Sequence, residues 1–188
     1  MTRLAFLWDQ SKCVSCGACI ASCNAANYSS STLPNPLWNW IRTNIKRIEL
    51  NSERPMIYLL QCQHCERPPC VTVCPTGASY KDTSTGLVKI NYDLCIGCRY
   101  CVVACPYQAR WFDGVIWAPR KCMGEECQDR ISRGMRPVCV EVCPANARDF
   151  GDLDDPNSSI SKRLAASRYI KLLENMGTEP KYFVVVGP

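Results

Sequence analysis

The arrangement of cysteine residues constrains this chain more than any other feature of its sequence. Sixteen cysteines occur in 188 residues and fall into four groups of four. The groups are Cys13, Cys16, Cys19 and Cys23; Cys62, Cys65, Cys70 and Cys74; Cys95, Cys98, Cys101 and Cys105; and Cys122, Cys127, Cys139 and Cys143. A chain with so many thiols in a few short segments is expected to fold around whatever those thiols bind.

The spacing within the groups predicts what they bind. The first and third groups read C-x2-C-x2-C-x3-C, and Pro106 follows the last cysteine of the third. This spacing is typical of bacterial sequences that bind [4Fe–4S] clusters, in which the fourth cysteine serves the other cluster of a pair. Four thiolates per cluster account for all sixteen cysteines, so we expect four [4Fe–4S] clusters.

Two other uses of cysteine fit the spacing less well. Disulfide scaffolds of small secreted proteins do not repeat C-x2-C-x2-C-x3-C. Zinc ribbons use separated C-x2-C pairs, whereas three or four cysteines crowd into each segment here. If zinc is bound at all, the best candidate ligands are those of the fourth group, Cys122, Cys127, Cys139 and Cys143.

The positive formal charge does not point to nucleic acid. Sixteen thiolates contribute −16 and four oxidised cluster cores of +2 contribute +8, so the formal +5 becomes about −3. Several cations stand close to cysteines in the sequence and are candidates to offset cluster charge: Lys12, Arg99, Arg120, Lys121 and Arg148. We expect no nucleic-acid partner.

The chain contains four copies of one local unit, an apolar strand-like run followed by a cysteine loop. The runs are residues 5–8, 56–60, 87–90 and 115–117. In three units the last cysteine opens Cys-Pro-x-x-Ala, at residues 74–78, 105–109 and 143–147; the first unit has Asn24 in place of proline. Because proline does not continue a helix comfortably, we expect one short helical turn before each Cys-Pro pair.

These repeats predict an α+β fold of two bacterial-ferredoxin-like βαβ modules, each with two clusters, short strands, short helices and long loops. Residues 56–109 hold groups two and three and form the predicted inner module. Residues 1–55 and 110–188 hold groups one and four and form the predicted outer module, together with the C-terminal tail.

Several connecting segments also have recognisable patterns. Residues 78–90 read as strand, turn and strand, and residues 38–50 favour a strand over a helix. A turn at 154–159 supplies an N-cap for a helix through Ala166, and residues 180–186 read as a last strand. We expect this tail to cover a sheet edge; docking onto another subunit is the alternative.

The sequence offers no membrane-spanning segment and no catalytic motif. No run approaches the ~20 apolar residues that cross a bilayer, and the N-terminus lacks a paired-arginine export signal. His64, the only histidine, is expected to be a structural hydrogen-bonding residue because each cluster already has four cysteines. Ordinary core packing is the expected role of four aromatic residues near the third group: Tyr100, Tyr107, Trp111 and Trp117.

The whole chain resembles the four-cluster iron–sulfur subunits of molybdenum and tungsten bis-pterin oxidoreductases, such as polysulfide, tetrathionate and dimethyl sulfoxide reductases. The shared phrases lie at residues 61–65, 68–70, 74–78, 150–156 and 177–181. The resemblance implies that group one pairs with group four and group two with group three. The implied ligand sets are Cys13, Cys16, Cys19 and Cys143 (cluster 1); Cys122, Cys127, Cys139 and Cys23 (cluster 2); Cys62, Cys65, Cys70 and Cys105 (cluster 3); and Cys95, Cys98, Cys101 and Cys74 (cluster 4).

The same resemblance implies a function and a setting. The chain would relay electrons between a molybdenum or tungsten bis-pterin catalytic subunit, facing the outer pair, and a polytopic quinone-reactive membrane subunit, facing the inner pair. It would have no catalytic site of its own. Peripheral membrane association is implied, on the extracytoplasmic face by co-export with a partner, with the cytoplasmic face as the alternative. A free polyferredoxin shuttle and a subunit of a hydrogenase or formate dehydrogenase are the alternative functions.

One departure from the family pattern concerns the fourth group. It reads Cys122-x4-Cys127, where the family usually has C-x2-C, and the longer loop contains Glu125 and Glu126. Negative charge beside a cluster disfavours the addition of an electron. We therefore predict a lowered reduction potential at cluster 2.

Overall fold

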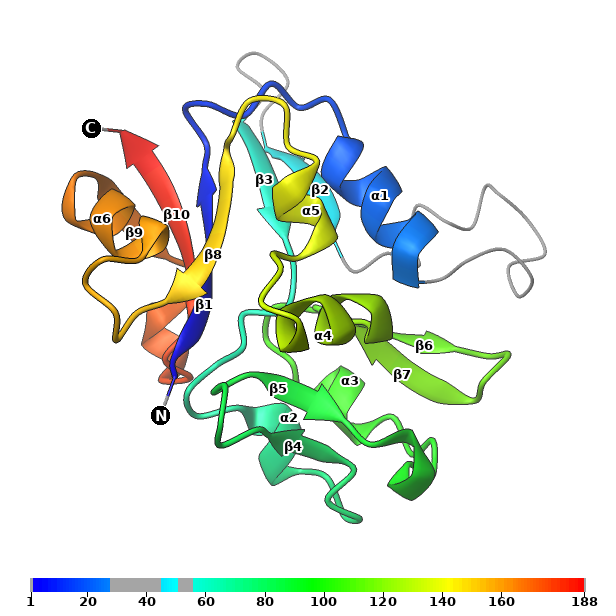
Figure 1. Cartoon of the computed structure of the whole chain (residues 1–188). Coiled ribbons are helices and arrows are strands. Elements are labelled where there is room, and N and C mark those ends of the chain that lie inside the picture. The colour runs from blue at the N-terminus through cyan, green and yellow to red at the C-terminus, as the bar shows by residue number, and fades with distance from the viewer. Residues whose placement is uncertain (1, 28–44, 51–55, 188) are drawn as a thin grey trace.

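A four-stranded sheet forms one side of the molecule. The computed structural model describes residues 2–27, 45–50 and 56–187. The strand order is β8-β1-β10-β9, in which β1 spans Leu4–Asp9, β8 Arg148–Asp152, β9 Arg168–Lys171 and β10 Tyr182–Gly187. β1 pairs antiparallel with β8 and parallel with β10 (Figure 1). Strands from the two ends of the chain therefore lie side by side in the centre of this sheet.

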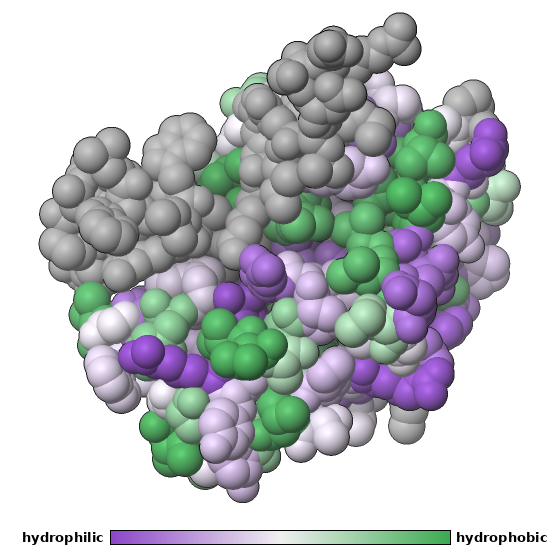
Figure 2. Space-filling model, turned by 180° about the vertical axis from the view of Figure 1, so that it is seen from behind, coloured by the Kyte–Doolittle hydropathy of each residue, from purple (hydrophilic) through white to green (hydrophobic). Residues whose placement is uncertain are grey.

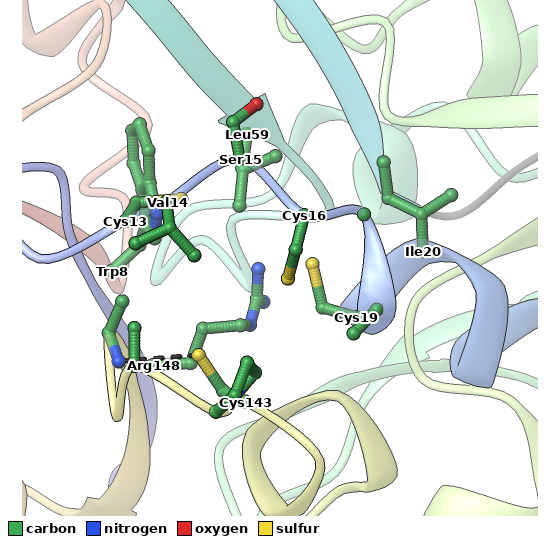
Figure 3. A pocket seen from close by; sticks show the side chains of 15 residues that line it. Trp8, Cys13, Val14, Ser15, Cys16, Cys19, Ile20, Leu59, Cys143 and Arg148 are labelled. Carbon is green, nitrogen blue, oxygen red and sulfur yellow. Dashed lines mark hydrogen bonds between the residues drawn. The ribbon is translucent and has the colours of Figure 1, made fainter.

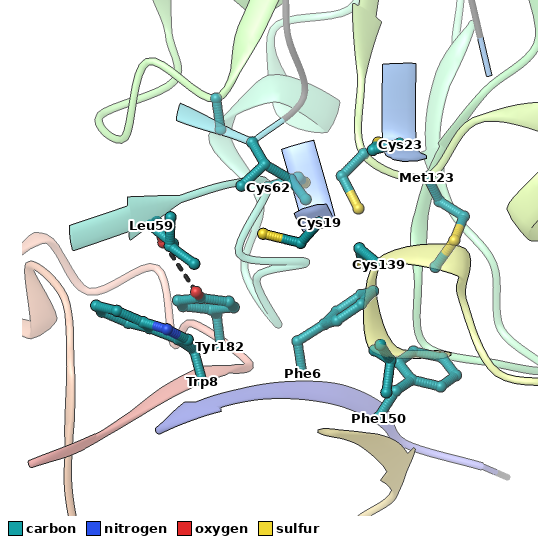
Figure 4. Close-up of a cluster of buried hydrophobic side chains, with 14 of the residues drawn as sticks. Phe6, Trp8, Cys19, Cys23, Leu59, Cys62, Met123, Cys139, Phe150 and Tyr182 are labelled. Atoms are coloured by element: carbon teal, nitrogen blue, oxygen red, sulfur yellow. Dashed lines mark hydrogen bonds between the residues drawn. The ribbon is translucent and has the colours of Figure 1, made fainter. Parts of the chain in front are cut away.

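Both faces of β1 are covered, which explains its unbroken apolar sequence. Phe6 and Trp8 pack on the face that carries many of the cysteines, together with Tyr182 (Figure 4). Leu7 points to the opposite face and packs with Ile160. Successive side chains of a strand point to opposite faces, so a strand buried on both sides needs apolar residues at every position.

Three two-stranded antiparallel hairpins complete the β-structure. They are β2 (Lys46–Leu50) with β3 (Met56–Leu60), β4 (Ser79–Lys81) with β5 (Val88–Ile90), and β6 (Arg110–Asp113) with β7 (Ala118–Lys121). Isolated hairpins are marginally stable in water. We infer that the packing of these hairpins against the cysteine loops stabilises them.

Short helices lie inside the cysteine groups, and proline limits their length. Three of them end just before a Cys-Pro pair and contain four residues each: α2 (Pro69–Thr72), α3 (Tyr100–Val103) and α5 (Val138–Glu141). α1 (Ala18–Asn27) lacks the proline and continues for ten residues. The described chain also has α4 (Glu125–Ser132), α6 (Ser159–Ala165) and single 3₁₀ turns at Tyr92–Leu94 and Glu174–Met176.

Most of the predicted elements are confirmed. Strands occur at 5–8, at 56–60 and within 87–90, and segment 78–90 is strand, turn and strand. Ser158 caps α6 by accepting a hydrogen bond from the Ser161 amide. The strand predicted for 38–50 is present at Lys46–Leu50, and residues 38–44 lie outside the described part. The tail covers a strand edge as expected, because β10 lies along β1.

Two predictions are wrong, and they concern the same part of the molecule. Residues 115–117 form the turn between β6 and β7 instead of a strand. Trp117, in this turn, and Tyr100, in α3, are 62% and 61% exposed and do not pack in the core. Tyr107 and Trp111 are buried as expected. An apolar run predicts that its side chains are buried, but it does not indicate whether they are buried by the same chain or by a partner protein.

The described residues contain no helix long and apolar enough to cross a membrane. The division into modules 56–109 and 1–55 with 110–188 stays a prediction.

Candidate iron–sulfur centres

The first thiol site, site 1, joins the first and last parts of the chain. Its cavity is lined by Cys13, Cys16, Cys19 and Cys143 (Figure 3). The first three come from the loop before α1 and its first turn, and Cys143 follows α5. The cavity wall is otherwise largely apolar and includes Trp8.

Two further cavities are lined by complete quartets from groups two and three. Site 3 contains Cys62, Cys65, Cys70 and Cys105. Site 4 contains Cys74, Cys95, Cys98 and Cys101. In each site, three thiols come from one group and the fourth comes from the other. The two groups are thereby interlocked.

Site 2 consists of four buried thiols, Cys23, Cys122, Cys127 and Cys139. The Asn27 side-chain amide lies 3.8 Å from the Cys23 sulfur and 3.6 Å from the Cys127 sulfur. Burial raises the pKa of the Cys122 thiol well above its usual range, and the nearby Cys139 and Cys23 thiols raise it further. This mutual influence shows that the members of the quartet lie close together.

Neighbouring sites follow one another in the order 1, 2, 3, 4. Burial is the main cause that raises the pKa of Cys19 in site 1, and Cys139 of site 2 raises it further. Cys62 of site 3 acts in the same way on Cys122 of site 2. Burial raises the pKa of Cys101 in site 4 most, and Cys70 of site 3 raises it further. Each site is thus near the next one, and we infer that the four sites form one row.

Backbone amides donate hydrogen bonds to the last cysteine of three groups. The Ser79 amide lies 3.3 Å from the Cys74 sulfur. The alanine amides of the other two repeats lie 3.4 Å (Ala109) and 3.3 Å (Ala147) from the Cys105 and Cys143 sulfurs. These donors follow from the Cys-Pro-x-x-Ala repeat, in which the backbone turns back over its own cysteine. At Cys74, burial alone would raise the pKa, but the Ser79 amide and the Thr76 hydroxyl outweigh it and lower the pKa.

The cavities fit iron–sulfur clusters in the donors that they present. Trp8 Nε1, Arg110 Nη1 and Arg148 Nε and Nη1 are buried without hydrogen-bond partners among the described residues. Trp8 and Arg148 line site 1, and Arg110 lines sites 3 and 4. Buried donors need acceptors, and the sulfurs of a cluster accept hydrogen bonds. Thiolate quartets with unpaired donors around them therefore suit these clusters.

Burial keeps several thiols protonated until a cluster binds. It raises the pKa of Cys65 to about 12, with the nearby Cys62 thiol acting in the same direction. Burial raises the pKa of Cys23 still further. Cluster ligands are thiolates, so insertion of a cluster must release these protons.

His64 is a structural residue, as the sequence predicts. Its side chain is fully buried, Nδ1 accepts a hydrogen bond from the Val88 amide at 3.1 Å, and its ring stacks on Phe6. Burial, and then the Lys121 ammonium, hold the pKa of His64 well below its usual range. A neutral imidazole therefore ties the second cysteine group to β5.

The structure separates the four cysteines of the zinc alternative. Cys143 lies in site 1, whereas Cys122, Cys127 and Cys139 belong to site 2. Among the described residues, no group of three or more His, Cys, Asp or Glu side chains is arranged to hold a single metal ion. The structure thus does not bring the four cysteines of the zinc alternative together in one site.

The unusual loop of the fourth group places its carboxylates at the protein surface, with Glu125 exposed and Glu126 half-buried. Gly124 precedes α4, and Glu125 and Glu126 occupy the first turn of this helix. They line an open polar hollow with Asn27 and Asp129, while Cys127 on the same helix is buried. Because these carboxylates border an open hollow, water and salt screen part of their charge.

Arg110 is the functional residue that the sequence analysis does not identify. It is buried and lines two thiol cavities. A signal was present in the repeat: Arg110 and Arg148 each stand five positions after a cysteine that opens Cys-Pro-x-x-Ala. In both places the residue directly after the repeat is a buried arginine.

Fold and sites together define a ferredoxin-type protein with four thiolate quartets, and comparison with known proteins agrees. A family model described as a 4Fe-4S dicluster domain matches residues 55–153, and a second with the same description matches residues 12–78. A polysulfide reductase polypeptide of Wolinella succinogenes is 40% identical, covering 97% of this chain and 94% of that protein. A sulfite dehydrogenase subunit of Allochromatium vinosum is 41% identical, covering 96% of this chain and 81% of that protein. Protein NrfC of Escherichia coli K12 is 39% identical, covering 97% of this chain and 80% of that protein.

The chain thus belongs to the 4Fe-4S dicluster family of iron–sulfur subunits of oxidoreductases. It carries four [4Fe–4S] clusters, with sixteen cysteines available to bind them. Its role is electron transfer, and it is not the catalytic subunit. The family implied by the resemblance and the fold class predicted from the repeats are both confirmed.

Proposed function

We propose that this chain relays single electrons between a molybdenum or tungsten bis-pterin catalytic subunit of the sulfur-compound reductase type and a quinone-reactive membrane subunit. The names of its relatives support the first partner, because they include a component of a polysulfide reductase and one of a sulfite dehydrogenase. When bound, each cluster accepts and donates one electron. The protein supplies thiolate ligands, hydrogen bonds and fixed charges around the clusters.

The proposed ligand sets are the four quartets. They are Cys13, Cys16, Cys19 and Cys143 at site 1; Cys23, Cys122, Cys127 and Cys139 at site 2; Cys62, Cys65, Cys70 and Cys105 at site 3; and Cys74, Cys95, Cys98 and Cys101 at site 4. Support comes from the three cavities that each contain one whole quartet.

The exposure of the cysteines is the observation that carries this proposal. Cys16 in site 1 and Cys98 in site 4 are exposed, and both are the second cysteine of a C-x2-C-x2-C-x3-C group. Every thiol of site 2 is buried, as are three of the four in site 3. A row of sites that is open at its two ends and closed in the middle suits the entry of electrons at one end and their exit at the other.

The surface around site 4 supports the membrane subunit as the partner at that end. Large apolar side chains are exposed there, namely Leu94, Ile96, Tyr100, Val103, Val115, Ile116 and Trp117. Toward the lower left of the view from behind, over the part of the molecule with β4 to β7, apolar side chains are exposed among polar ones; a second apolar area lies toward the upper right (Figure 2). Exposed apolar patches of this kind mark interaction surfaces. A partner that presents apolar helices, as a polytopic membrane protein does, would cover this surface.

The proposed setting is a complex attached to the membrane surface through that subunit. We place it on the extracytoplasmic face, exported in a folded state together with a signal-bearing partner. Protease added to intact spheroplasts tests this location. Digestion of the chain without disruption of the cells supports the extracytoplasmic face, and protection until lysis points to the cytoplasmic face.

Anaerobic isolation of the native complex through a tag on this chain tests the proposed function. We expect about sixteen irons per chain, about one molybdenum or tungsten per chain and a co-purifying membrane subunit. A chain that fractionates alone, with its irons but without either metal, would instead be a free polyferredoxin shuttle. Co-purification with a nickel-containing or formate-oxidising subunit would identify a hydrogenase or formate dehydrogenase.

A further inference from the structure

Three buried cations lie at the three junctions between neighbouring thiol sites. Arg148, Lys121 and Arg110 are 1%, 3% and 3% exposed. Charged side chains are rarely buried to this degree without compensating partners nearby. Their surroundings show what each one compensates.

Arg110 lies between sites 3 and 4. Its Nη2 donates to the Cys70 sulfur of site 3 at 3.0 Å and to Ser79 Oγ at 2.7 Å. The side chain lines the cavities of both sites, and its Nη1 has no hydrogen-bond partner among the described residues. Burial acts to lower the pKa of Arg110, but the thiols of Cys70 and then of Cys101, in site 4, outweigh it.

Arg148 lines the cavity of site 1 and reaches toward site 2 through Gln61, whose Nε2 lies 4.0 Å from the Cys122 sulfur. Its guanidinium extends toward the sulfurs of site 1 (Figure 3), and Nη2 donates to Gln61 Oε1. Nε and Nη1 have no partner within the described part of the chain. Burial would lower the pKa of Arg148, but Cys139 of site 2 and Cys19 of site 1 contribute to holding it above its usual range.

Lys121 occupies the junction between sites 2 and 3. It directly precedes Cys122 of site 2, and its ammonium donates to the Cys122 carbonyl at 2.5 Å and to the Val88 carbonyl. Burial lowers the pKa of Lys121, while the Cys62 thiol of site 3 and the Cys122 thiol act to raise it. Lys121 therefore lies beside Cys122 of site 2 and contacts Val88, which lines the cavity of site 3.

The repeat explains why two of these cations occupy equivalent places. Arg110 is the first residue of β6 and Arg148 is the first residue of β8, each directly after Cys-Pro-x-x-Ala. The second group has Ser79 at this position, and its hydroxyl accepts a hydrogen bond from Arg110. One guanidinium is thereby placed within each pair of interlocked groups, and Lys121 lies between the two pairs.

We propose that Arg148, Lys121 and Arg110 are shared electrostatic determinants of the cluster row, each raising the reduction potentials of the two clusters that it separates. An added electron makes a cluster more negative, and a nearby buried cation stabilises that charge more strongly than a solvated one would. One electron moves from a reduced cluster to its oxidised neighbour, no bond forms or breaks, and the summed charge of the pair is unchanged. A cation between the two clusters therefore favours reduction of the pair without holding the electron on either member.

Redox titration monitored by electron paramagnetic resonance on the isolated native complex tests this proposal. In Arg110→Gln, two of the four midpoint potentials of this chain should fall by about 59 mV. For a one-electron couple this is a tenfold decrease in the equilibrium constant for reduction. Arg148→Gln should lower the other two midpoints by a similar amount. Lys121→Gln should lower one midpoint from each of these pairs. This overlapping pattern needs no prior assignment of signals to clusters.

A matched control is Arg133→Gln, which removes one positive charge from an exposed pair with Asp129 on α4. It should leave all four midpoints unchanged. Iron content must stay near that of the native complex in every variant compared. Midpoints that move no more than in the control, or a shift confined to a single cluster in each variant, would overturn the proposal.

Charge-conserving variants separate this role from a merely structural one. Arg110→Lys and Arg148→Lys lose the planar hydrogen-bonding group but keep the charge, so their midpoints should stay near the native values. If a Gln variant loses iron, the Lys variant still tests the proposal, because midpoints lowered beyond those of the control despite the retained charge would contradict it. The complex can fail to contain molybdenum or tungsten while this pattern holds, so the two proposals can fail separately.

Discussion

Sites 1 and 4 are built from the same cysteine spacing but stand on different supports. Site 1 is backed by the four-stranded sheet, with Trp8 fully buried in its wall. Site 4 is bordered by the β4–β5 and β6–β7 hairpins, and large apolar side chains around it are exposed. The cysteine spacing therefore determines how the loop folds around a cluster, whereas the surrounding elements determine whether the site is covered by the chain itself or is open to a partner.

The difference has a consequence for assembly. β1 and β10 hold site 1 in place from within the chain, because both strands lie in the centre of a sheet. Around site 4, apolar side chains such as Val103 and Trp117 remain uncovered among the described residues. We infer that the chain stabilises the site 1 end itself and that a partner completes the site 4 end.

Loss of a ligand at each end should produce the largest effect. Cys16→Ser and Cys98→Ser should each remove one cluster, leaving about twelve irons per chain. Under the proposed function, Cys98→Ser should stop electron exchange with quinol but allow reduction from the catalytic side, and Cys16→Ser should do the reverse. Iron analysis and reduction by quinol or by a soluble dye measure these outcomes. The same electron-transfer defect in both variants would contradict the assignment of opposite roles to the two ends.

Removal of a tryptophan at each end should separate core packing from docking. Trp8→Ala should cost ~3–5 kcal/mol because it opens a large cavity in the core. Trp117→Ala, at an exposed turn, should cost less than about 1 kcal/mol but weaken binding of the membrane subunit. Anaerobic thermal bleaching of the cluster absorbance reports stability, and co-purification reports binding. Equal losses of stability would show that the two ends are supported alike.

The glycines in the two equivalent loops offer a finer comparison. Gly17 and Gly97 both have positive φ, +74° and +70°. Alanine in this conformation costs about 1–2 kcal/mol at either place. A Cβ at Gly97 would also lie 2.8 Å from Trp117 Cδ1 and from its carbonyl oxygen, whereas a Cβ at Gly17 meets nothing within 4 Å. The cluster absorbance of Gly97→Ala should therefore bleach at a lower temperature than that of Gly17→Ala. The opposite order would show that the contact with Trp117 does not restrict the loop at Gly97.

The carboxylates of the fourth group should have the smallest effect. The double variant Glu125→Gln/Glu126→Gln should raise the midpoint of cluster 2, because it removes negative charge near that site. Since Glu125 is exposed, we expect the midpoint potential to rise by less than about 59 mV, which is a tenfold change in the equilibrium constant for reduction. Asp154→Asn, at an exposed pair with Arg3 remote in sequence, serves as the control. A redox titration with no rise beyond this control would show that these carboxylates do not tune the cluster.

Cysteine spacing allowed much of the site to be predicted, because a thiolate loop around a cluster is a local structure. The Cys-Pro pairs likewise predicted where α2, α3 and α5 end. Long-range placement was harder to predict. The sequence suggested that the tail covers a strand, but the pairing of β10 with β1 depends on contacts between the two ends of the chain.

The errors have physical causes of the same kind. Residues 115–117 are apolar, and apolar runs usually indicate a buried strand. Here they form an exposed turn, which suits a surface that another protein covers. Cysteine spacing alone does not identify Arg110, because it stands five positions beyond Cys105 and only the folded chain places it against Cys70.

The central claim is a row of four clusters that is accessible at its two ends. The most direct measurement is the relaxation of each cluster's paramagnetic signal in the presence of a soluble dysprosium chelate, on the cluster-loaded chain released from its complex. We predict that two of the four clusters relax faster on addition of the chelate, and that both are protected again in the intact complex. An equal response from all four clusters, or a response from the clusters of sites 2 and 3, would contradict this claim.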